Sequence, residues 1–226
     1  MRSARKGGKE TGRKLLDAAA RVFAEKGYRG ATVLEISRLA GANVAAVNYH
    51  FRDKETRYVE AWRNDFSQSI DKSPPDGGVP ADAPAGERLR GHIEALLRRI
   101  SDGKNLEFWI ARKELANPTG LLKEVMRQEV APVHARMEGA VRELLGPGAS
   151  EAQVRYSVIS IASQCFEPIV MSRTLKEQGD SYPPPIDVEK YIEHVVRFSL
   201  GALKALRASN AGRSQSAKKT KKAGRS

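Results

Sequence analysis

The chain has 226 residues, 40% of them apolar, which favours a soluble globular protein with a sizeable buried core. The formal net charge of +12 is uneven: residues 1–60 carry +6, residues 207–226 carry +7, and the stretch between them sums to −1. Positive charge at both ends is typical of a protein that binds a polyanion there. For the C-terminal end alone, a merely solvated terminus is the simpler interpretation.

The cysteine content and the apolar runs bear on the compartment. Cys165 is the single cysteine, so an intramolecular disulfide is excluded and a reducing compartment is favoured. No apolar run is long enough to span a bilayer, and the basic start MRSARKGGKETGRK has no apolar signal core. We therefore expect a cytoplasmic protein.

The chain begins with a charged segment and a first helix. Residues 1–10 contain glycine and many charges, which predicts a mobile basic arm. Structure should begin near Thr11, and Gly27 should end the first helix. Its apolar side chains recur at helical spacing, at Leu15, Ala18, Ala19, Val22 and Phe23.

The next segment predicts a short helix over Val33–Ala40. Thr32 and Glu35 have the spacing of a capping box, in which the Thr hydroxyl accepts from the third helical amide and the Glu carboxylate reaches back. The inward stripe of this helix is predicted to consist of Ile36, Leu39 and Ala40.

A tight turn and a second short helix are predicted to follow. Gly41 suits a turn that needs positive φ, and Asn43 is a good N-cap for a helix over Val44–His50. Two short helices across a glycine-containing turn are the pattern of a helix-turn-helix, whose second helix enters the DNA major groove.

The rest of the chain is predicted to be helical as well. Asp53 can cap a fourth helix that reaches about Ile70, and Ser73–Gly86, dense in Pro, Gly and Ala, should be a long loop. No strand signal appears, so the fold class is all-α with about nine helices. The later helices are predicted over Glu87–Ser101, Lys104–Ala116, Leu121–Leu145, Glu151–Lys176 and Asp187–Ala208, with a kink or restart at Pro132 and at Pro168. The basic, low-complexity tail 209–226 is expected to be disordered.

The second short helix carries the candidate base-reading side chains. Asn48 can bond adenine or a phosphate, and the methyl groups of Val44 and Ala46 can meet thymine methyls. Ordinary packing explains Val44 and Ala46 equally well. Val47 and Phe51 are expected on the inward face.

Candidate phosphate contacts surround these base-reading residues. Tyr49 and His50 can bond phosphates through their polar edges, and Lys54 can do so together with the amides at the start of the fourth helix. Arg29, Thr32 and Asn43 lie close in sequence to the same surface. The arm residues Arg2, Arg5, Lys6 and Lys9 can add non-specific affinity.

The run FAEKGYRGATVLEISRLAGANVAAVNYHFRDKE, within Leu15 to Lys54, resembles the N-terminal domain of the TetR family of transcriptional regulators. The matching features are Phe23, Gly27, Tyr28, Thr32, Ala40-Gly41, Tyr49-His50-Phe51 and Lys54. Val44, Ala46 and Asn48 depart from residues common in the family, which bears on the operator sequence. ELANPTG, around Glu114, and NYHF are similar to the CecR-like subgroup.

The resemblance implies a division of labour along the chain. Residues 11–54 would bind DNA, with Tyr49 and Lys54 on phosphates, and residues 55–208 would bind an effector and form a homodimer. The expected function is a ligand-responsive repressor that binds a palindromic operator and is released by a small apolar effector. Candidate ligand-binding residues are Phe108, Trp109, Arg112, Met126, Met137, Gln164 and Phe166.

The last two predicted helices carry the apolar stripes that the resemblance assigns to the dimer. Such stripes suit a four-helix contact between subunits and suit an intramolecular core equally well. Their members are Val154, Val158, Ile161, Ala162 and Cys165 in one helix, and Val188, Ile192, Val195, Ala202 and Leu206 in the other.

Signals for other functions are weak. The sequence has no Gly-rich phosphate loop, no nucleophile elbow and no paired Cys or His at metal spacing, so we expect neither an enzyme nor a metal or cofactor. Cys165 should be a small core residue, with a redox-sensing thiol as the lesser alternative. The alternative function is a non-specific, nucleoid-associated DNA-binding protein that uses the basic ends.

Overall fold

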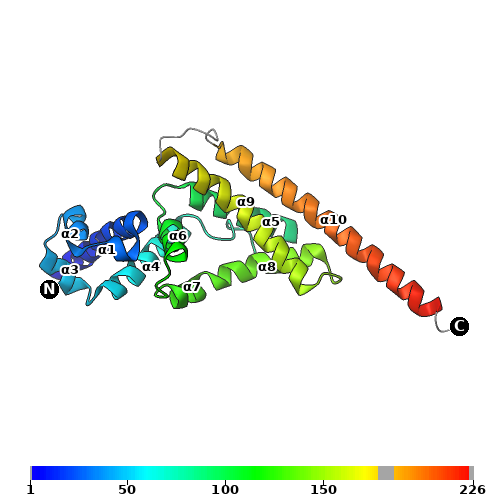
Figure 1. Cartoon of the computed structure of the whole chain (residues 1–226), viewed down its shortest axis with the longest axis horizontal. Helices are drawn as coiled ribbons and strands as arrows, with labels where there is room; N and C mark the ends of the chain where they lie inside the picture. The colour runs from blue at the N-terminus through cyan, green and yellow to red at the C-terminus, as the bar shows by residue number, and fades with distance from the viewer. Residues whose placement is uncertain (1, 178–185, 224–226) are drawn as a thin grey trace. The chain divides into compact units, whose positions relative to one another are not determined.

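The structure, a computed structural model, describes residues 2–177 and 186–223 and contains ten α-helices and no strand over that range (Figure 1). The all-α prediction is therefore confirmed. The helices are α1 (Arg2–Gly30), α2 (Val33–Ala40), α3 (Val44–His50), α4 (Lys54–Lys72), α5 (Ala85–Ser101), α6 (Glu107–Ala116), α7 (Lys123–Glu129), α8 (Ala131–Leu145), α9 (Glu151–Glu177) and α10 (Val188–Ala223).

The chain forms two compact units that are not continuous in sequence. The first contains α1 to α4 with α6 and α7, and the second contains α5 with α8, α9 and α10. The chain passes between the units at residues 72/73, 101/102 and 131/132. This division differs from the expected boundary after residue 54, because α4, α6 and α7 belong to the same unit as the helix-turn-helix.

Within the first unit, α1 packs against α2, α4 and α6. The small core beneath the helix-turn-helix consists of Leu15, Val47 and Phe51. On the other side of α1, the carboxylate of Asp17 accepts hydrogen bonds from two α4 amides, those of Asn64 at 3.0 Å and Gln68 at 3.1 Å. These contacts fix α4 against the first helix.

A side chain of α4 caps the N-terminus of α6. The Asp65 carboxylate of α4 accepts from the amides of Leu106 and Glu107, at 2.5 and 2.7 Å, and Leu106 itself supplies no side-chain cap. Burial, together with the neighbouring Glu107 carboxyl, raises the pKa of Asp65 to about 7. The indole of Trp62 also donates to the Glu107 carbonyl at 3.1 Å. These contacts, made by residues more than 40 positions apart, bring α6 into the first unit.

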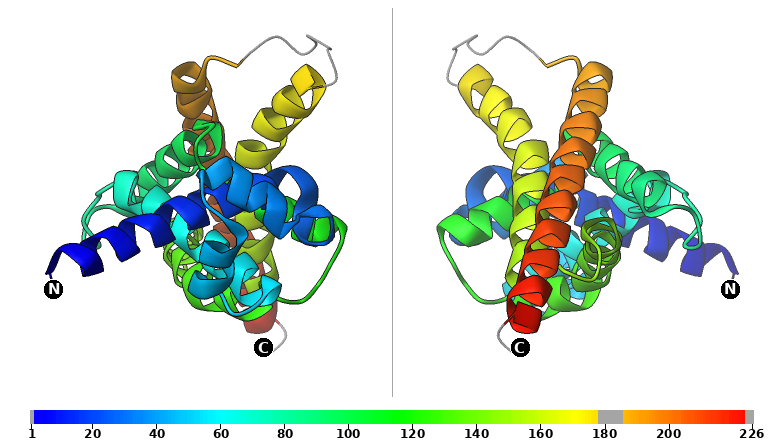
Figure 2. Two further views of the ribbon diagram at one scale, coloured as in Figure 1. Left: turned by 90° about the vertical axis from the view of Figure 1, so that its left-hand side faces the viewer. Right: turned by 90° about the vertical axis from the view of Figure 1, so that its right-hand side faces the viewer.

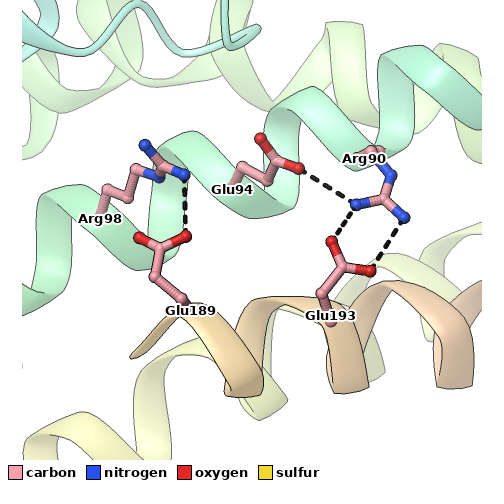
Figure 3. Close-up of polar contacts among 5 residues, drawn as sticks. All are labelled: Arg90, Glu94, Arg98, Glu189 and Glu193. Atoms are coloured by element: carbon pink, nitrogen blue, oxygen red, sulfur yellow. Dashed lines mark hydrogen bonds and ion pairs between the residues drawn. The ribbon is translucent and has the colours of Figure 1, made fainter. Parts of the chain in front are cut away.

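Within the second unit, α5, α9 and α10 pack against one another (Figure 2). Exposed ion pairs link α5 to α10: Arg90 contacts Glu193 and its own-helix neighbour Glu94, and Arg98 contacts Glu189 at 3.0 Å (Figure 3). Exposed pairs of this kind contribute little each because water screens the charges, so apolar packing contributes more to the stability of the unit.

Several helix ends differ from the prediction. The structure describes helix from Arg2, where a mobile arm was expected, and continues α10 to Ala223, where a disordered tail was expected from residue 209. The Ala, Lys and Arg residues in both segments have high helix propensity, which an expectation based on missing apolar residues does not weigh. In α1, regular helix geometry breaks at Gly27, where φ is 70°.

The two helix-internal prolines behave differently. Pro132 lies in the first turn of α8, just after α7 ends at Glu129, which confirms the restart predicted there. Pro168 lies inside α9, which the structure describes as one helix to Glu177. None of the described helices is long and apolar enough to cross a membrane.

Candidate DNA-binding surface

The capping box that starts α2 has the predicted geometry. The Glu35 amide donates to the Thr32 hydroxyl at 3.3 Å, and the Thr32 amide donates to the Glu35 carboxylate at 3.1 Å. Lys26 of α1 forms an ion pair with the same carboxylate. The hydrogen bond with Lys26, followed by the one with Thr32, lowers the pKa of Glu35. The start of α2 is thus fixed to α1.

The inward face of α2 is Ile36 and Ser37, which are 1% and 3% exposed. The prediction that Leu39 faces inward is wrong, because its side chain is 50% exposed. The half-buried Val33 and Ala40 lie beside these two buried residues, and a serine was not expected among them. The Ser37 hydroxyl donates to the Leu34 carbonyl at 2.9 Å, which satisfies it inside the fold.

The turn between α2 and α3 follows from two residues. Gly41 adopts φ 63° and ψ 32°, a left-handed conformation that favours glycine. Asn43 then caps α3, because its side-chain oxygen accepts from the Ala46 amide at 2.7 Å. Both predicted signals are confirmed, and together they set the direction in which α3 leaves the turn.

Helix α3 has a buried and an exposed face. Val47 has no exposed surface and Phe51 is 6% exposed, as predicted, whereas Asn48 is exposed and Tyr49 is 87% exposed. Ala45 is exposed beside them, a position that was not selected from the sequence although it precedes Asn48 and Tyr49 by three and four residues. The half-buried residues are Val44, Ala46 and His50.

Lys54 is held at the end of α1. Its ammonium donates to the Arg29 carbonyl at 3.3 Å and lies 4.8 Å from the centroid of the Tyr28 ring. Burial, and then the nearby Arg57, lowers the pKa of Lys54. The backbone at Arg29, whose side chain is exposed, therefore positions a cation at the first residue of α4.

Arg57 is a cation that sequence analysis did not select. It is 5% exposed, and its guanidinium lies 5.8 Å from the centroid of the Phe51 ring, just beyond α3. Its Nε atom has no hydrogen-bond acceptor in the described part of the chain, and burial lowers its pKa. Its position one turn after Lys54 was the available signal. Two cations thus lie at the start of α4.

The predicted effector-binding side chains are divided between the two units. Phe108, Trp109, Arg112 and Met126 lie on α6 and α7 in the first unit, and Met137, Gln164 and Phe166 lie on α8 and α9 in the second. Met137 is buried at 6% exposure, Arg112 is exposed, and the other five are half-buried. Gln164 is the member of this set that lines a groove of about 510 Å³ along α9 and α10.

The apolar stripes of α9 and α10 serve mainly the core of their own unit. Their buried members are Val154, Ile161, Cys165, Ile192 and Val195, whereas Ala202 and Leu206 are exposed. Burial raises the pKa of the Cys165 thiol to about 12, as in a core cysteine. The groove along these helices is lined by stripe members such as Ile161 and Leu206 and by the exposed rings of Tyr156 and Phe198, at 61% and 58% exposure.

Two protein-family models match this chain. Residues 15–56 match "Bacterial regulatory proteins, tetR family", and residues 85–203, about half of the chain, match the C-terminal domain of "HTH-type transcriptional dual regulator CecR". The first match spans the capped helices α2 and α3 with the start of α4.

Characterised relatives and a solved structure agree with these matches. The chain is 28% identical to the HTH-type transcriptional repressor AcnR of Corynebacterium glutamicum over 144 residues, covering 64% of this chain and 69% of AcnR. It is 28% identical over 166 residues to the HTH-type transcriptional dual regulator CecR of Shigella flexneri, covering 65% and 70%. AibR, solved with isovaleryl coenzyme A and operator DNA, shares the fold with a TM-score of 0.65 at 17% identity, over 82% of this chain and 96% of AibR. The chain therefore belongs to the TetR family of DNA-binding transcriptional regulators, in its CecR-like branch.

Proposed function

We propose that this regulator is a ligand-responsive repressor that binds a palindromic operator as a homodimer in the cytoplasm. The observation that carries the proposal is the exposed face of α3: Asn48 and Tyr49 are exposed there, whereas Val47 on the inward face is fully buried. A short, rigid helix with one anchored face can enter a major groove without reorganising. The relatives AcnR and CecR, a repressor and a dual regulator, are consistent with it.

The roles of the candidate residues follow from their exposure. Asn48 is assigned to a base edge and Tyr49 to a phosphate, because both side chains are free of the core. His50, Lys54, Arg29, Thr32 and Asn43 are assigned to the phosphate backbone around them. Val44 and Ala46, which are half-buried, combine packing with a methyl contact to the groove.

Homodimerisation is assigned to the exposed apolar face of α9 and α10. Large apolar side chains gathered on one face are typical of a protein interface. The members of this face are Tyr156, Ile159, Phe198 and Leu206, which are 37–61% exposed. A single reading helix offers few base contacts, so two copies on a palindrome provide the specificity that one copy lacks.

The effector is assigned to a small apolar molecule. AibR is described with isovaleryl coenzyme A, whose acyl group is of this kind, and we propose a comparable chemistry for the ligand of this chain. Within the first unit, the residues that we assign to it are Phe108, Trp109, Arg112 and Met126.

A footprint on the DNA upstream of the gene, followed by release assays with short- and medium-chain acyl compounds, tests the proposal. The expected result is one protected, inverted-repeat site and release by at least one acyl compound. Uniform protection of all DNA would favour the alternative, a nucleoid-associated protein using the +7 charge of residues 207–226.

A further inference from the structure

Glu114 lies at the centre of a hydrogen-bond cluster in the first unit. Its side chain is 9% exposed, and its carboxylate accepts from the Thr119 amide, the Thr119 hydroxyl and the Gly120 amide at 2.8–2.9 Å. The Tyr58 hydroxyl of α4 donates to the same carboxylate at 3.1 Å. The ELANPTG turn after α6 is therefore folded around this one carboxylate, which also fixes Tyr58.

Tyr58 extends this cluster to α1. The side chain has no exposed surface, and its ring contacts those of Phe23 and Tyr28, with centroids 4.8 and 5.2 Å away. Burial, and then the Glu114 carboxylate, raises the pKa of Tyr58. The hydroxyl consequently stays protonated and donates to Glu114 at every pH at which the protein would bind DNA.

Tyr28 in turn supports the cation at the start of α4. The Lys54 ammonium lies 4.8 Å from the Tyr28 ring centroid and donates to the neighbouring Arg29 carbonyl. Helix α6 also packs directly on this end of α1, since a Cβ atom at Gly27 would lie 3.7 Å from that of Lys113. Two series of contacts within the first unit therefore connect α6 to Lys54: one through Tyr58 and Tyr28, the other through the packing of α6 on Gly27.

We propose that Glu114 is a positioning residue for the DNA contact of Lys54. The carboxylate fixes Tyr58, the Tyr58 ring fixes Tyr28, and the Tyr28 ring together with the Arg29 carbonyl holds the ammonium in one place. Without the carboxylate, Lys54 samples several rotamers, and the side-chain entropy lost on fixing one of them offsets the gain from a phosphate contact, so that this contact is no longer made. This inference rests on the proposed phosphate contact of Lys54.

Two substitutions separate positioning from stability. Glu114→Ala removes the acceptor, whereas Glu114→Gln keeps its volume and one oxygen for the Thr119 and Gly120 amides, while the new amide can donate to the Tyr58 hydroxyl. The first measurement is an NMR spectrum of the DNA-free protein with ¹³C-dimethylated lysines. The methyl signal that is missing in Lys54→Ala belongs to Lys54. The ring current of Tyr28 should shift this signal in the wild type and in Glu114→Gln, and the shift should be lost in Glu114→Ala.

The second measurement is the dependence of DNA affinity on salt. Loss of one phosphate contact reduces the slope of log K against log salt by about 0.9. We expect this reduction in Lys54→Ala and in Glu114→Ala, no reduction in Glu114→Gln, and no further reduction in the double variant Lys54→Ala/Glu114→Ala. Should Glu114→Ala fail to fold, Tyr58→Phe removes only the hydroxyl and should give the same two changes.

The outcomes are distinguishable. An unchanged Lys54 signal in Glu114→Ala overturns the proposal, even if the variant melts at a lower temperature, because a merely structural role predicts just that. If the Lys54 signal changes in Glu114→Ala but Lys54→Ala leaves the slope of log K against log salt unaffected, Lys54 does not contact DNA, and the proposal is overturned for that reason. A changed signal with matching, non-additive slopes supports it.

Discussion

Val47 and Tyr49 stand two residues apart on α3 and face opposite sides: Val47 has no exposed surface, and Tyr49 is 87% exposed. The buried residue anchors α3 to Leu15 of α1, and the exposed one is presented to solvent. Because both orientations follow from a helix of seven residues capped at Asn43, the presentation of the outer face is a property of the local sequence.

Tyr49→Phe should weaken binding to all double-stranded DNA, because it removes one hydroxyl that we assign to a phosphate. A hydrogen bond to a charged group contributes about 1.5–3 kcal/mol, which corresponds to a loss of about 10- to 150-fold in affinity. The salt slope should not change, since no charge is removed. Fluorescence anisotropy with operator and random DNA measures both quantities. Tyr191→Phe on α10 is the control, because it removes a hydroxyl that donates to the Gln164 carbonyl, away from the residues that we assign to DNA and to the dimer. A loss confined to the operator would show that Tyr49 reads a base.

Asn48→Ala should change which sequence is preferred. A bidentate contact to adenine discriminates by about 1–3 kcal/mol, so preference at one base pair of each half-site should relax by about 5- to 150-fold. Selection of binding sequences from a random pool, with wild type and variant in parallel, measures this. Identical preferences for the two proteins would mean that the reading face of α3 is wrongly assigned.

Thr32→Ala should destabilise the first unit by about 1 kcal/mol, because the Glu35 amide loses its acceptor. Thr32→Ser keeps the hydroxyl and should retain most of the stability. Chemical denaturation monitored by circular dichroism compares the three proteins. Equal losses in both variants would assign the effect to the methyl group instead of the cap.

The Glu35 carboxylate should contribute stability that depends on pH. Its pKa in the folded state is lowered below the ordinary 4.5, mainly by the hydrogen bond with Lys26. The contribution is therefore complete above pH 4.5 and is lost as the pH falls through the lowered pKa. At pH 7 the melting temperature of the wild type should be higher than that of Glu35→Gln, and the difference between the two melting temperatures should decrease below pH 4.5. A gap that is constant from pH 7 to pH 3 would contradict this assignment.

Phe198→Glu should abolish self-association, since it places a charge in the exposed apolar face of α10, where Phe198 is 58% exposed. Phe198→Leu keeps that face apolar and should leave association nearly unchanged. Sedimentation velocity over a range of concentrations measures the mass of both variants. If Phe198→Glu sediments as wild type does, the dimer uses another surface.

The helix-turn-helix could be predicted because its signals are local. Thr32 with Glu35, Gly41 and Asn43 each act within four residues, and all four adopt the predicted geometry. The prediction for Leu39 was wrong because Ser37, a polar residue, lies on the buried face of α2, and Leu39 lies on the exposed face.

The extent of the first unit could not be predicted, because distant residues set it. Asp65 caps α6 from another helix, and Glu114 joins Tyr58 to the turn after α6. Neither contact leaves a periodic pattern. The stripes on α9 and α10 had two equally good interpretations for the same reason, since periodicity shows which face is apolar and not what covers it.

The most direct test of the central claim is a comparison of affinities for the inverted repeat found by footprinting and for random DNA of equal length, from low to physiological salt, with the stoichiometry of each complex determined. We predict two chains per repeat and a preference of at least about 1,000-fold that persists as salt rises. Equal affinities that fall together with salt, or one chain per repeat, would contradict it.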